Sequence, residues 1–147
     1  MLFFKKGKDL PHEASEEIDA NSLLEKHENG LMDDKSFLTS FRDIGVVYST
    51  PFGDHKDGGH RLFVLPDQER AAFLPVFTTE ERAREFYEKV GRCGFLILHS
   101  SFLSFLETTR KINEGNPPVK LGAVIDPGYY GVTIGANILS NVIEWIK

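Results

Sequence analysis

The segment FLPVFTTEERAREFYEKV, from Phe73 to Val90, joins a short apolar strand to the start of an amphipathic helix. Thr78 stands three residues before Glu81, the spacing of a capping box, in which hydroxyl and carboxylate each satisfy a free N–H of the helix start. The following apolar residues recur with the period of one helical face: Ala83, Phe86, Tyr87 and Val90. The segment therefore predicts a strand, a cap and a helix in direct succession.

Pro75 interrupts the apolar strand of this segment. Because proline has no N–H to donate to a neighbouring strand, it favours an edge position or a bulge. We therefore expect an exposed edge strand near Pro75, a kind of surface on which a partner could bind.

Upstream of this segment, the same patterns predict two helices and two strands. They are a helix from Ser22 to Gly30, a helix capped by Asp33 or Asp34, and strands over 46–50 and 61–65. Residues 52–60 are glycine-rich and polar, which predicts a loop. The two strands and the one at Phe73 are expected to pair as an antiparallel meander.

Downstream, the patterns predict three more strands and two more helices. The continuous apolar run 95–98 indicates a strand buried on both faces, and Ser100 or Ser101 can cap the helix after it. Strands are expected over 121–125 and 130–134, joined by the turn 126–128. The expected last helix is capped by Asn137 and points four residues inward: Ile138, Val142, Trp145 and Ile146.

These elements predict a single α+β domain over residues 21–147, preceded by a mobile N-terminal arm over residues 1–20. We expect a mixed, largely antiparallel sheet of about five to six strands, packed with about four to five helices. The strand order stays open, because meander and crossover pairings both satisfy the patterns.

Composition narrows the classes of function. The 147 residues are 41% hydrophobic, enough for one domain with its own core. The net charge of −5 argues against a nucleic-acid partner, because a protein needs a basic face to bind the phosphates of a nucleic acid. The single cysteine excludes an intrachain disulfide and is typical of a reducing compartment. No secretory signal or membrane-spanning run is recognisable, so we expect a cytoplasmic protein without a membrane partner.

Three short motifs occur in an order that resembles one family. They are Tyr48-Ser-Thr-Pro51, Leu74-Pro-Val-Phe-Thr-Thr79 and Val124-Ile-Asp-Pro-Gly128. Together with the two leading helices, they resemble the SseB N-terminal domain family, named for enhanced serine sensitivity. Thr79 stands where that family usually has serine, and Asp126 where it usually has asparagine. The resemblance implies a bacterial cytosolic α+β domain, and it implies no reaction, because the family's function is uncertain.

His55 and His60, flanked by Asp54 and Asp57, are the one group of metal-type ligands in the sequence. Imidazoles with carboxylates suit zinc or a similar ion. A solvated hairpin loop explains the same residues better, because the glycines make the loop flexible and no further ligand is identifiable. We expect no metal and no cofactor, and keep His55 and His60 as weak metal candidates.

Cys93 is a candidate nucleophile of a thiol-dependent enzyme, with the adjacent Arg92 as the one evident cation to activate it. A structural thiol is the favoured interpretation, because Cys93 leads into the apolar run at Phe95 and free cysteine is usually buried. The serines at 100 and 101 lack the flanking glycines of a hydrolase elbow, so helix capping explains them better.

Tyr129 and Tyr130 follow the turn that Asp126 opens. Tyrosine is common at interface hot spots, because a rigid ring with a polar tip can bury area at little entropic cost. The alternative is that one of the two rings packs on the sheet, because an aromatic residue beside a strand is often part of the core. Our first hypothesis is a non-enzymatic protein-interaction or regulatory module whose partner is a protein, or a second copy in a homodimer. The second is a small enzyme using Cys93 or the pair His55 and His60.

Overall fold

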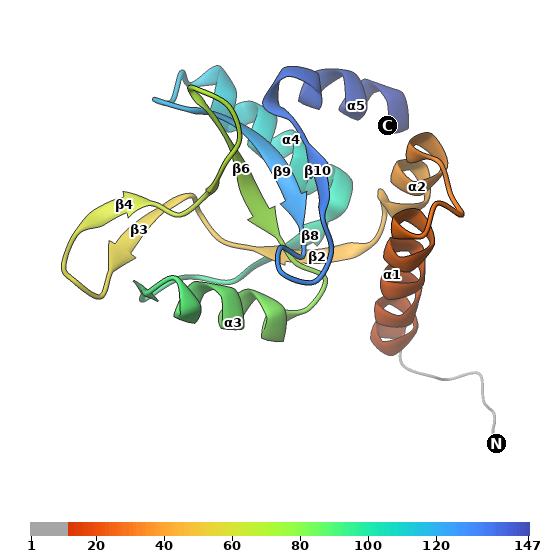
Figure 1. Ribbon diagram of the computed structural model, residues 1–147, viewed down its shortest axis with the longest axis horizontal. Coiled ribbons are helices and arrows are strands. Elements are labelled where there is room, and N and C mark those ends of the chain that lie inside the picture. Colours follow the sequence, from red (N-terminus) through yellow and green to blue (C-terminus); the bar gives the residue numbers. More distant parts are fainter. Residues whose placement is uncertain (1–11) are drawn as a thin grey trace.

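The computed structural model describes the backbone of residues 12–147 and the side chains of residues 20–147 (Figure 1). The helices are α1 (His12–Glu28), α2 (Asp34–Phe41), α3 (Glu80–Lys89), α4 (Phe102–Glu114) and α5 (Leu139–Ile146), with the short 3₁₀ helix η1 (Ala136–Ile138). The strands are β2 (Gly45–Tyr48), β3 (Phe52–His55), β4 (His60–Leu62), β5 (Leu65–Pro66), β6 (Ala71–Val76), β7 (Arg92–Cys93), β8 (Leu98–Ser101), β9 (Lys120–Ile125) and β10 (Val132–Ile134). The expected α+β class is confirmed.

The main sheet has the strand order β10–β9–β6–β5. Its centre is a parallel pair, β6 beside β9, with Leu74 opposite Ala123, while β10 and β5 pair antiparallel on the two sides. Both central strands point their C-terminal ends toward α3 (Figure 1). This parallel pair therefore brings the ends of β6 and β9 to the same place.

Two smaller sheets complete the fold, and they replace the expected meander. β2 pairs with β8, and an isolated bridge joins Val47 to Phe77 just after β6. Most of the expected loop 52–60 is a hairpin of β3 and β4, which projects away from α1 (Figure 1). The antiparallel return of the Phe73 strand is confirmed where Leu65 faces it from β5.

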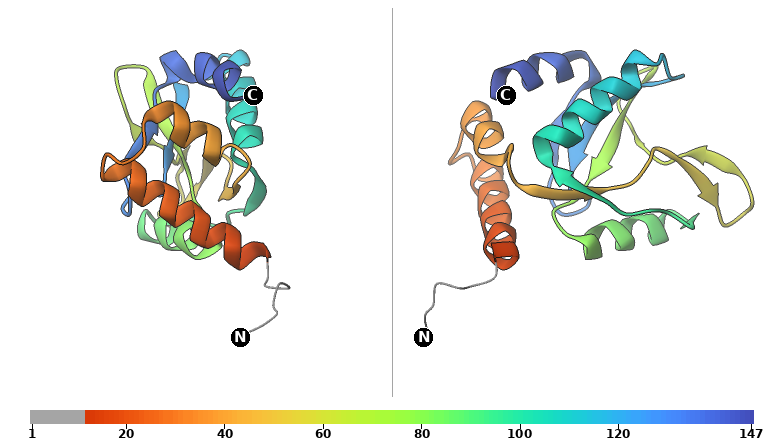
Figure 2. Two further views of the ribbon diagram at one scale, coloured as in Figure 1. Left: turned by 90° about the vertical axis from the view of Figure 1, so that its right-hand side faces the viewer. Right: turned by 180° about the vertical axis from the view of Figure 1, so that it is seen from behind.

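Two hydrophobic clusters form the interior. The larger one joins α1, α2, α4 and α5 to strands β2, β6, β9 and β10, and α4 packs across one face of the main sheet (Figure 2). The smaller one lies under α3 and consists of Val47, Phe63, Phe77, Ala83 and Tyr87. Strand β2 serves both clusters, because Val46 and Tyr48 face the larger one while Val47 faces the smaller.

Helix starts differ from expectation at three places. α1 begins at His12, so residues 12–20 of the expected arm belong to a helix, while residues 1–11 lie outside the described residues. The cap of α3 is Thr79, whose hydroxyl accepts from the Arg82 N–H. Thr78, the expected cap, donates its hydroxyl hydrogen to Asp126 instead. Asn137 lies inside η1 and does not cap α5. The cap at Ser101 is confirmed, since its hydroxyl accepts from the Ser104 N–H at 3.1 Å.

Several expectations about burial were wrong. Leu96 is 68% exposed, so the run 95–98 is not a buried strand, and β8 begins at Leu98. Trp145 and Ile138 are exposed rather than inward, while Val142 and Ile146 are buried as expected.

Pro75 is buried in the main sheet, so the expected exposed edge strand there was also wrong. β6 is covered by β9 on one side, and β5 pairs on the other side only as far as Phe73. No β5 residue is paired with Pro75, so the missing N–H of the proline leaves no β5 carbonyl without a donor.

Within residues 12–147, none of the helices combines the length and the apolar character that crossing a bilayer requires.

Candidate functional site

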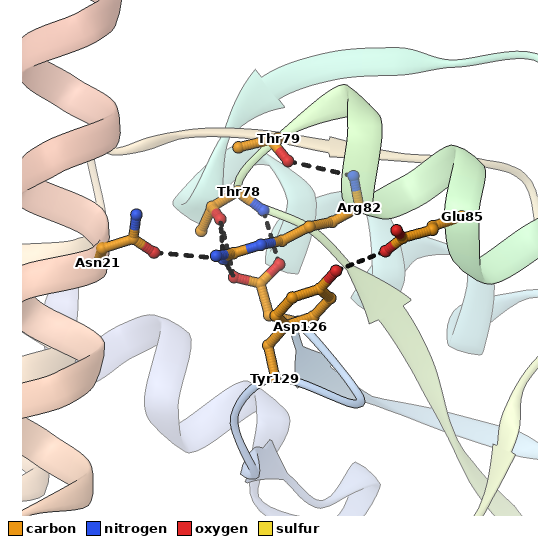
Figure 3. Close-up of polar contacts among 7 residues, drawn as sticks. All are labelled: Asn21, Thr78, Thr79, Arg82, Glu85, Asp126 and Tyr129. Atoms are coloured by element: carbon orange, nitrogen blue, oxygen red, sulfur yellow. Dashed lines mark hydrogen bonds and ion pairs between the residues drawn. The ribbon is translucent and has the colours of Figure 1, made fainter.

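A buried carboxylate joins the ends of the two parallel strands. Asp126, directly after β9, is fully buried and accepts hydrogen bonds from Thr78, two residues after β6 (Figure 3). The Thr78 N–H donates at 2.9 Å and the Thr78 hydroxyl at 2.7 Å. The third donor is the Arg82 guanidinium, at 2.9 Å from the same carboxylate. A buried carboxylate is stable only with such partners, and Asp126 has three.

The backbone at Asp126 shapes the turn that follows. Its φ of +46° lies in the left-handed region, which aspartate tolerates better than most residues. Its carbonyl accepts from the N–H groups of both Tyr129 and Tyr130, each at 2.9 Å. Its own N–H donates to Val76 at 2.8 Å. The turn carrying the two tyrosines is thereby fixed to the sheet by main-chain bonds.

Arg82 connects this turn to two helices. It comes from the first turn of α3, and its side chain also donates to Thr78 at 3.1 Å and to Asn21 of α1 at 3.2 Å (Figure 3). Its side chain is 19% exposed. The outer face of the guanidinium lies 4.3 Å from the centre of the Tyr129 ring, a cation–π contact.

The two tyrosines play different parts. Tyr129 is 48% exposed, and its hydroxyl donates to the Glu85 carboxylate, a bond that raises the pKa of Tyr129. Tyr130 is partly buried and packs against the larger hydrophobic cluster. Burial is the main cause that raises the pKa of Tyr130. The sequence left open whether a ring packs inward; the structure shows that Tyr130 does and that Tyr129 stays accessible.

Carboxylates surround both rings. Glu81 and Glu85 of α3 act electrostatically on Tyr129, and Glu25 and Glu28 of α1 act on Tyr130. The nearby cation, Arg82, is already paired with Asp126. We call this region the acidic tyrosine surface, and it comprises Tyr129, Tyr130, Glu25, Glu28, Glu81 and Glu85.

The histidines are on the hairpin of β3 and β4, far from this surface in the fold (Figure 1). His60 is paired with Asp54 at 2.9 Å, whereas the His55 ring nitrogen accepts from the backbone N–H of Asp57 at 3.0 Å. Each histidine therefore has its own local partner. In the part of the chain whose side chains are described, no group of three or more His, Cys, Asp or Glu residues could hold a metal.

Cys93 is exposed, which corrects the expectation of a buried structural thiol. Its neighbour Arg92 is the buried one, because successive side chains of a strand point to opposite faces. The Arg92 guanidinium donates to the Thr50 carbonyl at 2.7 Å and to the Phe52 carbonyl at 2.8 Å. Arg92 therefore forms these hydrogen bonds on the face of β7 opposite to the Cys93 thiol.

Arg92 is the centre of a second buried polar cluster. Its guanidinium carbon lies 5.0 Å from the centre of the Phe63 ring and 5.1 Å from the centre of the Tyr87 ring, and burial lowers the pKa of Arg92. The Tyr87 hydroxyl lies near Arg92 and the Ser49 backbone but completes no hydrogen bond within the described residues. Burial raises the pKa of Tyr87 to about 12. Gly53 leaves the space that Arg92 occupies, since a Cβ there would lie 2.4 Å from the Arg92 Nε.

A hollow of about 450 Å³ lies at the other end of the central strands, lined in part by Arg70, Arg110 and Lys120. Arg110 pairs with Glu144 at 3.2 Å, and Lys120 donates to the Asn113 carbonyl at 2.9 Å. Two of the three cations are therefore already engaged. None of the site residues predicted from the sequence lines this hollow.

The structure brings together Asp126, Tyr129 and Tyr130 and adds residues that sequence reasoning missed. These are Asn21, Thr78, Arg82 and Glu85. Arg82 and Glu85 are three residues apart and so share a helical face, which was a usable signal for a common role. Comparison of the chain with models of known families, with curated proteins and with solved structures found no match.

Proposed function

We propose that this chain is an SseB-like bacterial cytosolic domain that acts as a non-enzymatic protein-interaction module, and that its partner binds the acidic tyrosine surface. The observation that carries the proposal is the Tyr129 ring, which is half-exposed and yet held in place. Arg82 stacks on its face and Glu85 accepts from its hydroxyl. Such a ring loses little freedom on binding, and rigid tyrosines are therefore frequent hot spots.

The buried carboxylate supports a positioning role rather than catalysis. Asp126 has no exposed surface, and its oxygens accept from the Thr78 N–H, the Thr78 hydroxyl and Arg82. A general base must reach a proton on a substrate, and this carboxylate is covered by its own partners. What it does is hold the turn on which Tyr129 stands.

The charge of the surface defines the chemistry of the partner. Four carboxylates flank the tyrosines, and the whole chain carries a net charge of −5. A partner that presents lysine or arginine side chains would therefore meet complementary charge, whereas phosphate groups would be repelled. Binding is expected to weaken as salt concentration rises, because salt screens exposed charges.

Affinity capture from the cytosol of the source bacterium tests the proposal. The tagged wild-type chain is compared with Tyr129→Ala and with the control Leu96→Ala, which removes a side chain that is 68% exposed elsewhere. We expect a basic protein to be retained by the wild type and the control, to be lost from Tyr129→Ala, and to elute with salt. Circular dichroism establishes that all three are folded. Equal retention by Tyr129→Ala would contradict the proposal.

The exposure of Cys93 keeps a thiol-dependent enzyme as a second candidate. A nucleophilic cysteine needs a nearby cation or N–H groups that favour the thiolate. Alkylation of the folded protein at neutral pH distinguishes the two candidates. A rate well above that of a cysteine in an unstructured peptide supports the enzyme, and an equal or lower rate removes it.

A further inference from the structure

The hollow of about 450 Å³ lies where β6 and β9 begin, at the end of the main sheet opposite α3 (Figure 1). Its walls are the first residues of these two strands, the end of α4, and the start of η1 and α5. Gly122 of β9 allows η1 to pack directly on the sheet, because a Cβ there would lie 2.8 Å from the Ala136 nitrogen. The volume is typical of a site for a small molecule.

Two cations of this hollow are not neutralised by carboxylates. Lys120 donates to a main-chain carbonyl at 2.9 Å and to an asparagine side-chain oxygen at 3.2 Å, and both acceptors are uncharged. Within residues 20–147, Arg70 forms no ion pair, whereas Arg110 is paired with Glu144 at 3.2 Å. Arg70 and Lys120 therefore keep their positive charge available to a ligand.

The parallel pairing of β6 with β9 places these two residues side by side. Lys120 is in register with Ala71, and its N–H donates to the Arg70 carbonyl at 2.9 Å. Both side chains line the hollow. The backbone at Arg70 has a φ of +66°, a left-handed conformation that is free of strain only for glycine. The fold thus accepts a backbone strain at a position that carries a long cationic side chain.

We propose that this hollow binds the phosphate monoester of a small polyhydroxy compound, with the phosphate held by Arg70 and Lys120. Two adjacent cations favour a group with two negative charges, and a phosphate monoester carries a charge of about −1.5 to −2 at neutral pH. A carboxylate would neutralise only one of them. The planar guanidinium of Arg70 also matches the spacing of two phosphate oxygens.

The rest of the lining suits the hydroxyl groups of such a compound. Glu114 is the one carboxylate of the lining, so it can accept hydrogen bonds from hydroxyls and would repel a second phosphate. Asn137 and Ser140 are exposed at the start of α5 and add neutral donors and acceptors. The inference does not rest on the proposed function, because no residue that lines the hollow belongs to the acidic tyrosine surface.

An NMR titration of the ¹⁵N-labelled full chain tests the proposal. The probes are glycerol 3-phosphate, ribose 5-phosphate and adenosine 5′-monophosphate, each compared with its phosphate-free parent and with inorganic phosphate. We expect at least one ester to bind with a Kd below about 1 mM, and tighter than inorganic phosphate. Its amide shifts should be confined to the residues that line the hollow, and the three parent compounds should produce none.

Charge variants locate the site. Arg70→Gln and Lys120→Gln should each weaken binding of the ester by about tenfold or more, because each removes a charge-assisted hydrogen bond. Lys56→Gln removes the same charge from the exposed hairpin of β3 and β4 and should leave the affinity unchanged. The same spectra establish that each variant is folded.

Three results would overturn the proposal. The first is that no ester shifts the lining residues at concentrations up to about 10 mM. The second is equal affinity of the wild type and a folded Arg70→Gln. The third is that inorganic phosphate binds as tightly as every ester, because the hollow would then hold an adventitious ion only.

Discussion

Replacement of Asp126 by asparagine isolates the contribution of one buried charge. Asparagine keeps the size of the side chain and tolerates the left-handed backbone, whose φ is +46°. The amide oxygen can still accept from the Thr78 N–H. The amide nitrogen, however, takes the place of the oxygen to which Arg82 donates at 2.9 Å. Two donors then face each other in a place from which water is excluded.

The expected cost follows from the bonds lost. A hydrogen bond to a charged group contributes about 1.5–3 kcal/mol, and the Thr78 hydroxyl also loses a charged acceptor, so we expect about 2–4 kcal/mol for Asp126→Asn. Arg82 keeps its bonds to Asn21 and Thr78, which limits the loss. Asp126→Ala leaves the largely buried Arg82 cation and both Thr78 donors without the carboxylate, and should cost about 3–5 kcal/mol.

Urea unfolding at neutral pH measures this cost. With a slope of about 2 kcal/mol per molar urea, the midpoint of Asp126→Asn should fall by about 1–2 M. The matched control is Asp43→Asn, which removes an exposed carboxylate 3.4 Å from Arg42 and should cost less than about 0.5 kcal/mol. If Asp126→Asn cost no more than Asp43→Asn, the buried network would not hold the fold as described here.

Three further outcomes test other parts of the structure. Gly53→Ala places a Cβ 2.4 Å from the buried Arg92 and should destabilise by about 2–4 kcal/mol in urea unfolding, whereas Gly131→Ala meets nothing within 4 Å and should change little. The pKa of Tyr87 is about 12 in the folded chain and 10.0 in the unfolded chain. Above pH 10 the Tyr87 hydroxyl therefore loses its proton in the unfolded chain and keeps it in the folded chain. Stability should therefore fall by about 1.4 kcal/mol per pH unit between pH 10 and 12, and unfolding curves of Tyr87→Phe should lack that part of the loss. Cys93 should react with a thiol reagent about as fast in the folded protein as in urea, and strong protection would refute its exposure.

Much of the fold could be predicted from local patterns. The α3 helix, the Ser101 cap and strand β9 all follow from periodicity and capping within a few residues. The pairing of β6 with β9 could not, because a parallel pair joins segments separated by two helices and leaves no local signature. The prediction that the apolar run around Leu96 is buried was wrong, because apolar character alone does not determine whether a segment is buried.

The candidate site was predicted in part. The turn after Asp126 was expected to present tyrosines, and Tyr129 is accessible there. The role of Asp126 itself could not be predicted, because its partners Thr78 and Arg82 are more than 40 residues away in the chain. Thr78 was taken for the helix cap because Thr79, beside it, is chemically equivalent. Only the fold decides which of two adjacent threonines caps the helix and which binds the carboxylate.

The most direct test of the central claim is a calorimetric titration of the captured partner with purified variants of this chain. Tyr129→Ala should weaken binding by about 30-fold or more, the loss typical of a hot-spot residue, and Leu96→Ala should leave the affinity nearly unchanged. Tyr129→Phe, which keeps the ring on Arg82 and loses the bond to Glu85, should fall between them. An affinity that is the same for wild type and a folded Tyr129→Ala would contradict the account.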